Sequence, residues 1–292
     1  MRIKRVAAVA AVAALALGLT ACGGDDGGEG TGAGSKSFAA GSTMEKLNKA
    51  QKIKVGTKFD QPGFGQKGLS GKPEGFDVEI AKIVVKELGI PEDKIEWVET
   101  PSKVREDVIV NGTVDLVAAT YTIKDERKEK ISFAGPYYEA GQNIMVRKDD
   151  AAITGPDSFK DGSKKVCSVT GSTPAEEIKK YVKDVGSQLV LFDTYDKCRD
   201  ALKGKQVDAV TTDNVILLGY IAKDEASFKM ATDNFTKEPY GIGVKKDDTA
   251  FRTFINDLLE KIFTDGRWKS AWDETAGKFG ATLGTPPTIN RY

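Results

Sequence analysis

Ligand chemistry in this chain depends on arginine, lysine, aspartate and hydroxyl side chains, because its 292 residues include no histidine. Without histidine there is no Ser-His-Asp or Cys-His nucleophile, no His-ligated metal site and no imidazole pH switch. The three cysteines are too few for a four-thiolate zinc site, and the sequence contains no phosphate-binding loop, Gly-x-Ser-x-Gly turn or calcium loop. The residue types therefore predict a site that binds by charge, with no catalytic residue, metal or cofactor.

Arg127 and Asp213 each stand where an apolar, strand-like segment leads into a helix. The planar guanidinium of Arg127 suits a carboxylate, which it can bind through two parallel hydrogen bonds. Its neighbours in residues 124–130 (KDERKEK) also fit a solvated surface charge, which position alone favours. Asp213 could bind a cation, although aspartate at this place is commonly a helix N-cap, and the two roles can coexist.

Strand-like and helix-like segments alternate in two successive blocks, and these elements must position the charged residues. The first block predicts strands at 52–59, 95–99 and 114–121 and helices at 76–88 and 102–110. The second predicts strands at 165–169, 188–192 and 208–212 and helices at 174–185, 195–202 and 214–222, before a final amphipathic helix at 251–262. This alternation predicts an α/β fold of two lobes with largely parallel sheets. Ligands bind beyond the carboxyl ends of such strands, here residues 120–122 and 212–213.

The first residues have the pattern of an export signal. A basic start, an uncharged stretch at 6–19 and small residues predict a secretory signal peptide over residues 1–21. The uncharged stretch is too short to span a membrane as a helix. Residues 19–22 (LTAC) resemble a bacterial lipobox, which implies that Cys22 is the lipid-modified first residue of the mature chain. The Gly-rich residues 22–45 then predict a lipid-anchored flexible linker, with the protein exported and anchored to the outer face of the cytoplasmic membrane.

Six short motifs resemble family 3 extracellular solute-binding proteins, the polar amino-acid receptors of ABC importers. They are residues 75–80 (GFDVEI), 119–127 (ATYTIKDER), 133–138 (FAGPYY), 171–174 (GSTP), 212–214 (TDN) and 240–243 (YGIG). Within this family, the chain is most similar to the glutamate/aspartate-binding lipoproteins. The resemblance implies a two-lobed, type II periplasmic-binding-protein-like fold with two hinge strands. The implied first lobe is residues 46–138 plus 241–285, the second lobe is 139–240, and 286–292 form a C-terminal tail.

The resemblance also implies the ligand contacts. Arg127 would bind the α-carboxylate of an amino acid and Asp213 its ammonium group. Hydroxyl or backbone groups would come from Thr120, Thr122, Ser172 and Thr173, and contacts to the ligand's side chain from Lys58, Arg105 and Tyr195. The three basic residues exceed Asp213 by two charges, and uncompensated charge in a closed cleft is unfavourable.

This charge balance predicts an acidic ligand, glutamate or aspartate. Two alternatives remain. One is a receptor for a neutral polar amino acid such as glutamine or asparagine, and the other is an enzyme on the same scaffold that resembles cyclohexadienyl dehydratases. An enzyme of this kind needs a positioned acid, and we expect no cleft carboxylate besides Asp213.

Cys167 and Cys198 both lie in the second block and are predicted to form a disulfide, since export places them where disulfides persist. The alternative is two unrelated buried thiols. The predicted partners are the amino-acid ligand, the membrane subunits of an ABC importer, and the membrane itself through the lipid anchor. Nucleic acid is not expected, because 43 basic residues are balanced by 43 acidic residues, and the protein is expected to be a monomer.

Overall fold

The structure is a computed structural model that describes residues 36–292. The predicted signal peptide at 1–21, the lipidation residue Cys22 and most of the predicted linker lie outside the described residues. Within residues 36–292, no helix is both long enough and apolar enough to cross a membrane.

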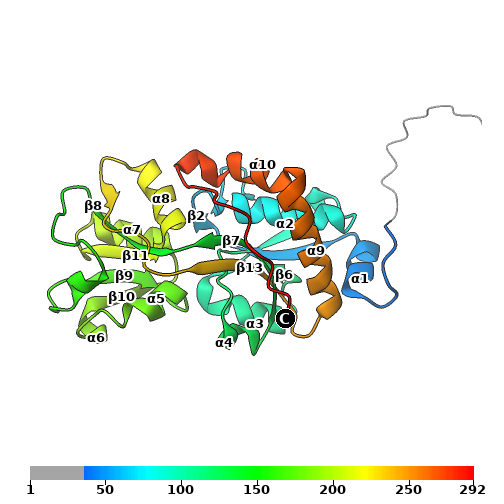
Figure 1. The fold of residues 1–292 in the computed structure, drawn as a ribbon, viewed down its shortest axis with the longest axis horizontal. Coiled ribbons are helices and arrows are strands. Elements are labelled where there is room, and N and C mark those ends of the chain that lie inside the picture. The colour runs from blue at the N-terminus through cyan, green and yellow to red at the C-terminus, as the bar shows by residue number, and fades with distance from the viewer. Residues whose placement is uncertain (1–35) are drawn as a thin grey trace, which may run out of the picture. The chain divides into compact units, whose positions relative to one another are not determined.

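One five-stranded sheet organises the first lobe (Figure 1). Its strand order is β5 (Ile95–Glu99), β1 (Ile53–Thr57), β6 (Leu116–Val117), β13 (Glu238–Val244) and β7 (Ser132–Ala140). Strand β1 runs parallel to β5 and β6, whereas β13 runs antiparallel to β6 and β7. The helices of this lobe are α1 (Thr43–Ala50), α2 (Phe76–Glu87), α3 (Arg105–Val110), α4 (Asp125–Lys128), α9 (Thr249–Asp265) and α10 (Arg267–Asp273).

A second five-stranded sheet organises the second lobe. Its order is β10 (Leu189–Phe192), β9 (Val166–Val169), β11 (Ala209–Asp213), β8 (Gln142–Arg147) and β12 (Phe228–Met230). Its helices are α5 (Thr173–Ile178), α6 (Val185–Gln188), α7 (Tyr195–Lys203) and α8 (Asn214–Lys223). Two sheets with helices packed around them confirm the predicted α/β fold of two lobes.

The prediction of largely parallel sheets is wrong in one respect, because both sheets are mixed. The chain leaves the first lobe along β7 and returns to it along β13, so these two strands pair antiparallel. Strand β8 follows β7 directly and pairs antiparallel with β11 and β12. In Figure 1, β7 and β13 lie side by side at the edge of the first sheet and extend toward the second lobe. Their role as hinge strands stays a prediction.

A small sheet and four 3₁₀ turns complete the fold. The small sheet is formed by β2 (Asp60–Gln61), β3 (Gly65–Lys67) and β4 (Pro73–Glu74), which follow β1. The 3₁₀ turns are η1 (Glu92–Lys94), η2 (Ser102–Val104), η3 (Pro156–Phe159) and η4 (Ala276–Phe279). Helix α2 begins after Gly75, whose φ is +132°. A Cβ there would lie 2.3 Å from the carbonyl carbon of Phe64, so this close approach requires glycine.

The folded body begins before the predicted boundary at residue 46. Helix α1 begins at Thr43, and the Ser42 hydroxyl caps it by accepting a hydrogen bond from the Glu45 N–H. Phe38 packs edge-on against Phe254 of α9, with ring centres 5.8 Å apart. At the other end of the chain, Asn290 N–H donates to the Gly135 carbonyl of β7. Both terminal segments of the described chain therefore pack on the first lobe.

Two predicted elements differ from the structure. The apolar run at 114–121 is buried as expected but forms a strand only over Leu116–Val117. The chain turns out of the sheet at Thr120, which has a left-handed φ of +44°, a conformation that hydrophobic periodicity does not reveal. The helix predicted at 174–185 ends at Ile178, and α6 begins only at Val185. Between them, the backbone N–H groups of Lys183 and Asp184 donate to the Gln188 side chain.

The second lobe contains a disulfide between Cys167 of β9 and Cys198 of α7, with Cα atoms 5.5 Å apart. Both residues are fully buried. The bond attaches helix α7 covalently to the second sheet.

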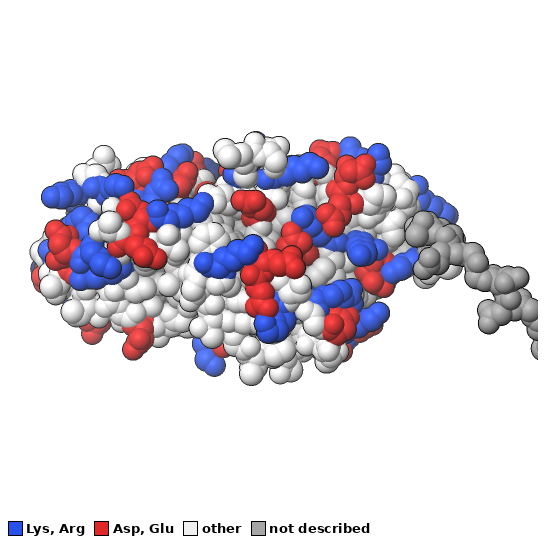
Figure 2. Space-filling view, turned by 90° about the horizontal axis from the view of Figure 1, so that it is seen from above, with Lys and Arg blue, Asp and Glu red and all other residues white. Residues whose placement is uncertain are grey.

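Surface charges of opposite sign are interspersed on the face shown in Figure 2. Many are paired within one helix, as in Lys49–Glu45, Lys179–Glu176 and Lys269–Asp273. Exposed pairs of this kind contribute little to stability.

Candidate functional site

A small cavity lies between the two lobes, with a volume of about 10 Å³. Six predicted ligand residues line it: Arg105, Thr120, Ser172, Thr173, Tyr195 and Asp213. Four residues that we did not predict also line it: Ser102, Pro174, Thr212 and Ile216. Lys58, Thr122 and Arg127 lie beside the cavity without lining it. Residues from both lobes therefore form a closed, largely polar wall.

The second lobe contributes the start of α5 to this wall. Ser172 is the N-cap of α5, and its hydroxyl accepts a hydrogen bond from Ala175 N–H at 3.1 Å. Thr173 approaches the first lobe, with its hydroxyl 3.2 Å from that of Thr122. Gly171 packs so closely against the first lobe that a Cβ would lie 2.8 Å from the Cα of Lys103. These contacts hold the two walls together at one edge of the cavity.

Asp213 lies at the end of β11, where the sequence predicts either a helix cap or a cation ligand. Its side chain makes no capping bond to α8. Instead, Oδ2 accepts a hydrogen bond from the Tyr240 hydroxyl at 2.6 Å, and the buried Oδ1 has no hydrogen-bond partner in the described part of the chain. Burial, and then the nearby Glu238 carboxylate, raise the pKa of Asp213 to about 8. A ligand ammonium group would satisfy Oδ1 and favour the carboxylate form.

Lys58 and Arg105 are buried cations on the first lobe. Lys58 Nζ donates to the Ser102 hydroxyl at 2.8 Å, and Arg105 donates to the carbonyl of Ala119 at 2.9 Å and to that of Thr120 at 3.3 Å. Arg105 Nε has no partner, and the guanidinium lies 4.1 Å from the centre of the Tyr121 ring. Among residues 36–292, no carboxylate forms an ion pair with either cation.

The pKa values of both cations are lowered in this buried environment. Burial, together with the charge of Arg105, lowers the pKa of Lys58 to about 7. Burial and the charge of Arg127 lower the pKa of Arg105 to about 10. An anionic group placed between these side chains would reverse both shifts.

Arg127 has a different environment. Its Nε pairs with Glu106 at 3.1 Å, and its two terminal nitrogens donate to the carbonyls of Thr122 at 2.8 Å and Gly171 at 3.1 Å. Gly171 belongs to the second lobe, so this side chain joins the two lobes. The alternative of a solvated charge is wrong, because the Arg127 side chain is only 11% exposed. In this conformation all three nitrogens contact protein groups, so its role as an α-carboxylate ligand stays a prediction.

The predicted excess of two positive charges is also wrong. Glu106 compensates Arg127, and two further acidic residues, Asp60 and Asp77, lie close enough to shift the pKa of Lys58. The sequence signal for Asp77 is an acidic residue beside Phe76 at the start of an apolar helix face. Glu106 gives no such signal, because it lies in a charged segment at the start of α3 that resembles an ordinary exposed surface.

Asp77 supports the cavity from behind. Its carboxylate is fully buried and accepts hydrogen bonds from Thr120 N–H at 2.7 Å and the Tyr137 hydroxyl at 2.5 Å. These bonds hold Thr120 in its left-handed conformation, which places the carbonyls that Arg105 binds. Burial raises the pKa of Asp77 to about 7. Asp77 does not line the cavity, so Asp213 is the single carboxylate among the lining residues, as expected, and Asp77 is a second buried carboxylate behind the wall.

Comparison with curated proteins finds close relatives among amino-acid-binding proteins. The chain is 40% identical over 298 aligned positions to the glutamate-binding protein GluB of Corynebacterium efficiens, which covers 98% of this chain and 96% of that protein. It is 38% identical over 227 positions to the ABC transporter glutamine-binding protein GlnH of Bacillus subtilis, covering 77% of this chain and 81% of that protein.

Solved structures give the same result for the fold. An ancestral arginine-binding protein bound to arginine superposes with a TM-score of 0.72 at 35% identity, covering 77% of this chain and 98% of that one. The family model of bacterial extracellular solute-binding proteins, family 3, matches residues 53–275. That range includes both sheets and every residue that lines the cavity. The chain therefore belongs to family 3 of the bacterial extracellular solute-binding proteins.

Proposed function

We propose that this protein is an extracytoplasmic receptor that binds an acidic L-amino acid, glutamate or aspartate, between its lobes and delivers it to an ABC importer. The observation that carries the acidic specificity is the pair of buried cations, Lys58 and Arg105, which have only neutral hydrogen-bond partners. Asp60 and Asp77 lie near Lys58, but neither cation has an ion-pair partner among the described residues, and a ligand side-chain carboxylate would provide one. The name of the glutamate-binding relative supports the same ligand.

The other groups of the ligand would bind elsewhere in the cavity. The ammonium group would pair with Asp213, and the α-carboxylate would bind near Thr122, Thr173 and Arg127. Because these groups come from both lobes, only the closed state makes all of the contacts. The ligand therefore shifts the population toward closure through its differential affinity for that state. The closed pair of lobes would be the form that the importer's membrane subunits recognise.

Isothermal titration calorimetry of the mature protein with glutamate, aspartate, glutamine and asparagine tests the ligand. We expect at least one acidic amino acid to bind more tightly than both amides. Tighter binding of an amide than of both acids would overturn the acidic specificity while leaving the amino-acid receptor in place.

Glutamine is a second candidate ligand. The relatives at 38% and 40% identity that are named glutamine-binding support it. A specific observation favours it as well: the pKa of Lys58 is lowered to about 7, so near neutral pH a large fraction of this side chain is uncharged and suited to an amide oxygen. A charged Lys58 favours glutamate, and a neutral Lys58 favours glutamine. Measuring the preference between the two amino acids as the charge of Lys58 changes therefore distinguishes the two candidates.

An enzyme on the same scaffold would need an acid that reaches the substrate. Asp213 is the single carboxylate among the residues lining the cavity, and we assign it to the ammonium group of the ligand. Mass spectrometry of the bound amino acid before and after incubation tests this assignment: a receptor returns its ligand chemically unchanged.

The membrane attachment belongs to the same proposal. Cys22 would carry the lipid after removal of residues 1–21, and the residues between Cys22 and the folded body would tether a monomeric protein to the outer face of the cytoplasmic membrane. Replacing Cys22 with Ala should release the protein from the membrane fraction without changing its ligand affinity. Membrane association that persists in this variant would contradict the lipid anchor.

A further inference from the structure

A second contact between the lobes lies outside the cavity. The segment after β1, which carries β2 and β3, meets the start of α7 and one side of α8. We call Asp60, Pro62, Gly219 and Tyr220 the closure patch, and none of them lines the cavity. Asp60 and Pro62 belong to the first lobe, and Gly219 and Tyr220 belong to the second.

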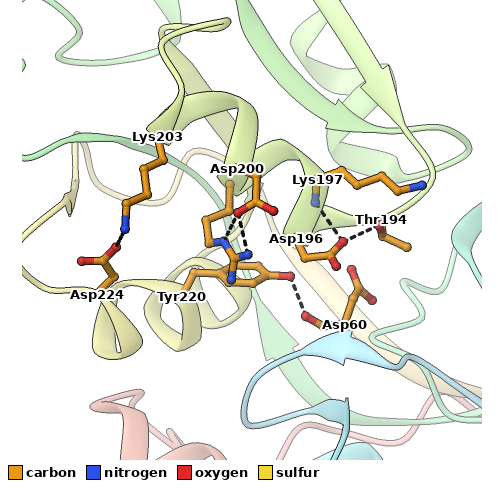
Figure 3. A network of polar contacts seen from close by, with 9 residues as sticks. Asp60, Thr194, Asp196, Lys197, Asp200, Lys203, Tyr220 and Asp224 are labelled. Carbon is orange, nitrogen blue, oxygen red and sulfur yellow. Dashed lines mark hydrogen bonds and ion pairs between the residues drawn. The ribbon is translucent and has the colours of Figure 1, made fainter.

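Asp60 caps a helix of the opposite lobe. Thr194 occupies the N-cap position of α7 but makes no capping bond, because its hydroxyl binds Asp196 instead. The missing acceptor is the Asp60 carboxylate, whose Oδ2 accepts Tyr195 N–H at 2.7 Å. Figure 3 shows the Asp60 side chain extending from the first lobe toward α7. The Tyr220 hydroxyl of α8 donates to the backbone carbonyl of Asp60 at 2.5 Å. Asp196 accepts the Lys197 N–H within α7, so the contribution from the other lobe is the bond to the first N–H of the helix, at Tyr195.

Gly219 makes the closest approach in the patch. It lies inside α8, where its φ needs no glycine, yet a Cβ would fall 2.5 Å from the Pro62 carbonyl oxygen and 3.0 Å from the Pro62 Cβ. Within the second lobe alone, alanine is a better helix former than glycine. Alanine at position 219 therefore favours the helical conformation of α8 but would clash with Pro62 of the first lobe.

We propose that the closure patch determines ligand affinity without touching the ligand, by setting the fraction of molecules in which the lobes are closed. The inference rests on the proposed binding of an amino acid between the lobes. When the binding-competent state is only partly populated, the apparent Kd rises as the inverse of that fraction. A change in the patch should therefore weaken every ligand by the same factor and leave the preference among ligands unchanged.

The test compares Gly219→Ala with Gly186→Ala. Gly186 is a helical glycine of the second lobe whose Cβ would make only an ordinary contact, at 3.5 Å from Asp184 Oδ1. We expect Gly219→Ala to raise the Kd for glutamate and glutamine by the same factor, roughly tenfold or more. Small-angle X-ray scattering should show a more extended unliganded form, whereas Gly186→Ala should match the wild type in both measurements.

A second variant, Tyr220→Phe, removes only the hydroxyl that binds Asp60, and it should raise both Kd values by roughly two- to tenfold. Wild-type Kd and wild-type scattering in Gly219→Ala would overturn the proposal. A Kd that rises for glutamate alone would overturn it too, since it would mean that the patch acts through the cavity. If the wild type binds no amino acid, the proposed function fails, and the scattering comparison still tests whether the patch holds the lobes closed.

Discussion

The two arginines beside the cavity have the same charge but different environments. Arg127 pairs with Glu106 and donates to carbonyls of both lobes. Arg105 has no carboxylate partner among the described residues, and its Nε is unpaired. The comparison shows that burying a cation does not by itself create an anion site. The Arg105 region is available to a ligand carboxylate, whereas Arg127 already contributes to joining the lobes.

The largest effect is expected from Arg127→Ala. The change removes contacts to both lobes and leaves Glu106 unpaired, so glutamate and glutamine should both bind a few hundredfold more weakly. Calorimetry with both amino acids checks this, with circular dichroism to verify folding. Weaker binding of glutamate alone would mean that Arg127 recognises the acidic side chain of the ligand, the role expected of Arg105.

Arg105→Gln should act on specificity instead. Removal of an unpaired buried cation should weaken glutamate roughly fiftyfold, because a charge-assisted hydrogen bond is lost, and glutamine much less. Arg267→Gln is the matched control, since Arg267 is a more exposed arginine paired with Asp265 on the outside of the first lobe. Equal losses for the two ligands would show that Arg105 contributes general affinity and not recognition of an acidic side chain.

Lys58 predicts a pH dependence. Its pKa is lowered to about 7 in the unliganded protein, and a bound carboxylate would raise this pKa. Above pH 7, Lys58 must therefore take up a proton when glutamate binds, which weakens binding as the pH increases. The ratio of glutamate to glutamine affinity should therefore fall by up to about fiftyfold from pH 7 to pH 9. Using the ratio cancels the titration of Asp213, whose pKa is about 8 and which faces both ligands. Lys58→Met should abolish this dependence, and a pH-dependent ratio in that variant would assign it to another group.

The smallest effect is expected from Glu106→Gln, which removes the negative charge beside Arg127 while keeping the side-chain shape. The positive charge near the cavity then increases, and the preference for glutamate over glutamine should rise roughly threefold. Competition titration measures this ratio directly. A lower preference for glutamate would mean that Glu106 acts mainly by orienting the Arg127 side chain, and less by neutralising its charge.

The sequence was sufficient for the fold class and for most of the cavity wall. Asp213 and residues 172–173 could be placed because strands lead directly into helices there, and strand ends gather at one edge of a sheet. The Glu106–Arg127 pair could not be predicted, because these residues belong to separate elements whose approach depends on tertiary packing. Thr120 was missed as a turn for a related reason: its positive φ is maintained by the Asp77 carboxylate from a helix far away in the sequence.

The disulfide has a mechanical consequence. Cys198 lies one turn after Tyr195 on α7, so the helix that lines the cavity and accepts the Asp60 contact is bonded covalently to β9, next to the edge of the second sheet. The start of α7 therefore cannot move away from the sheet without moving β9 as well. Reduction of this bond would remove that link while leaving every cavity residue in the chain, so the oxidation state of two residues outside the cavity sets how firmly one of its walls is held.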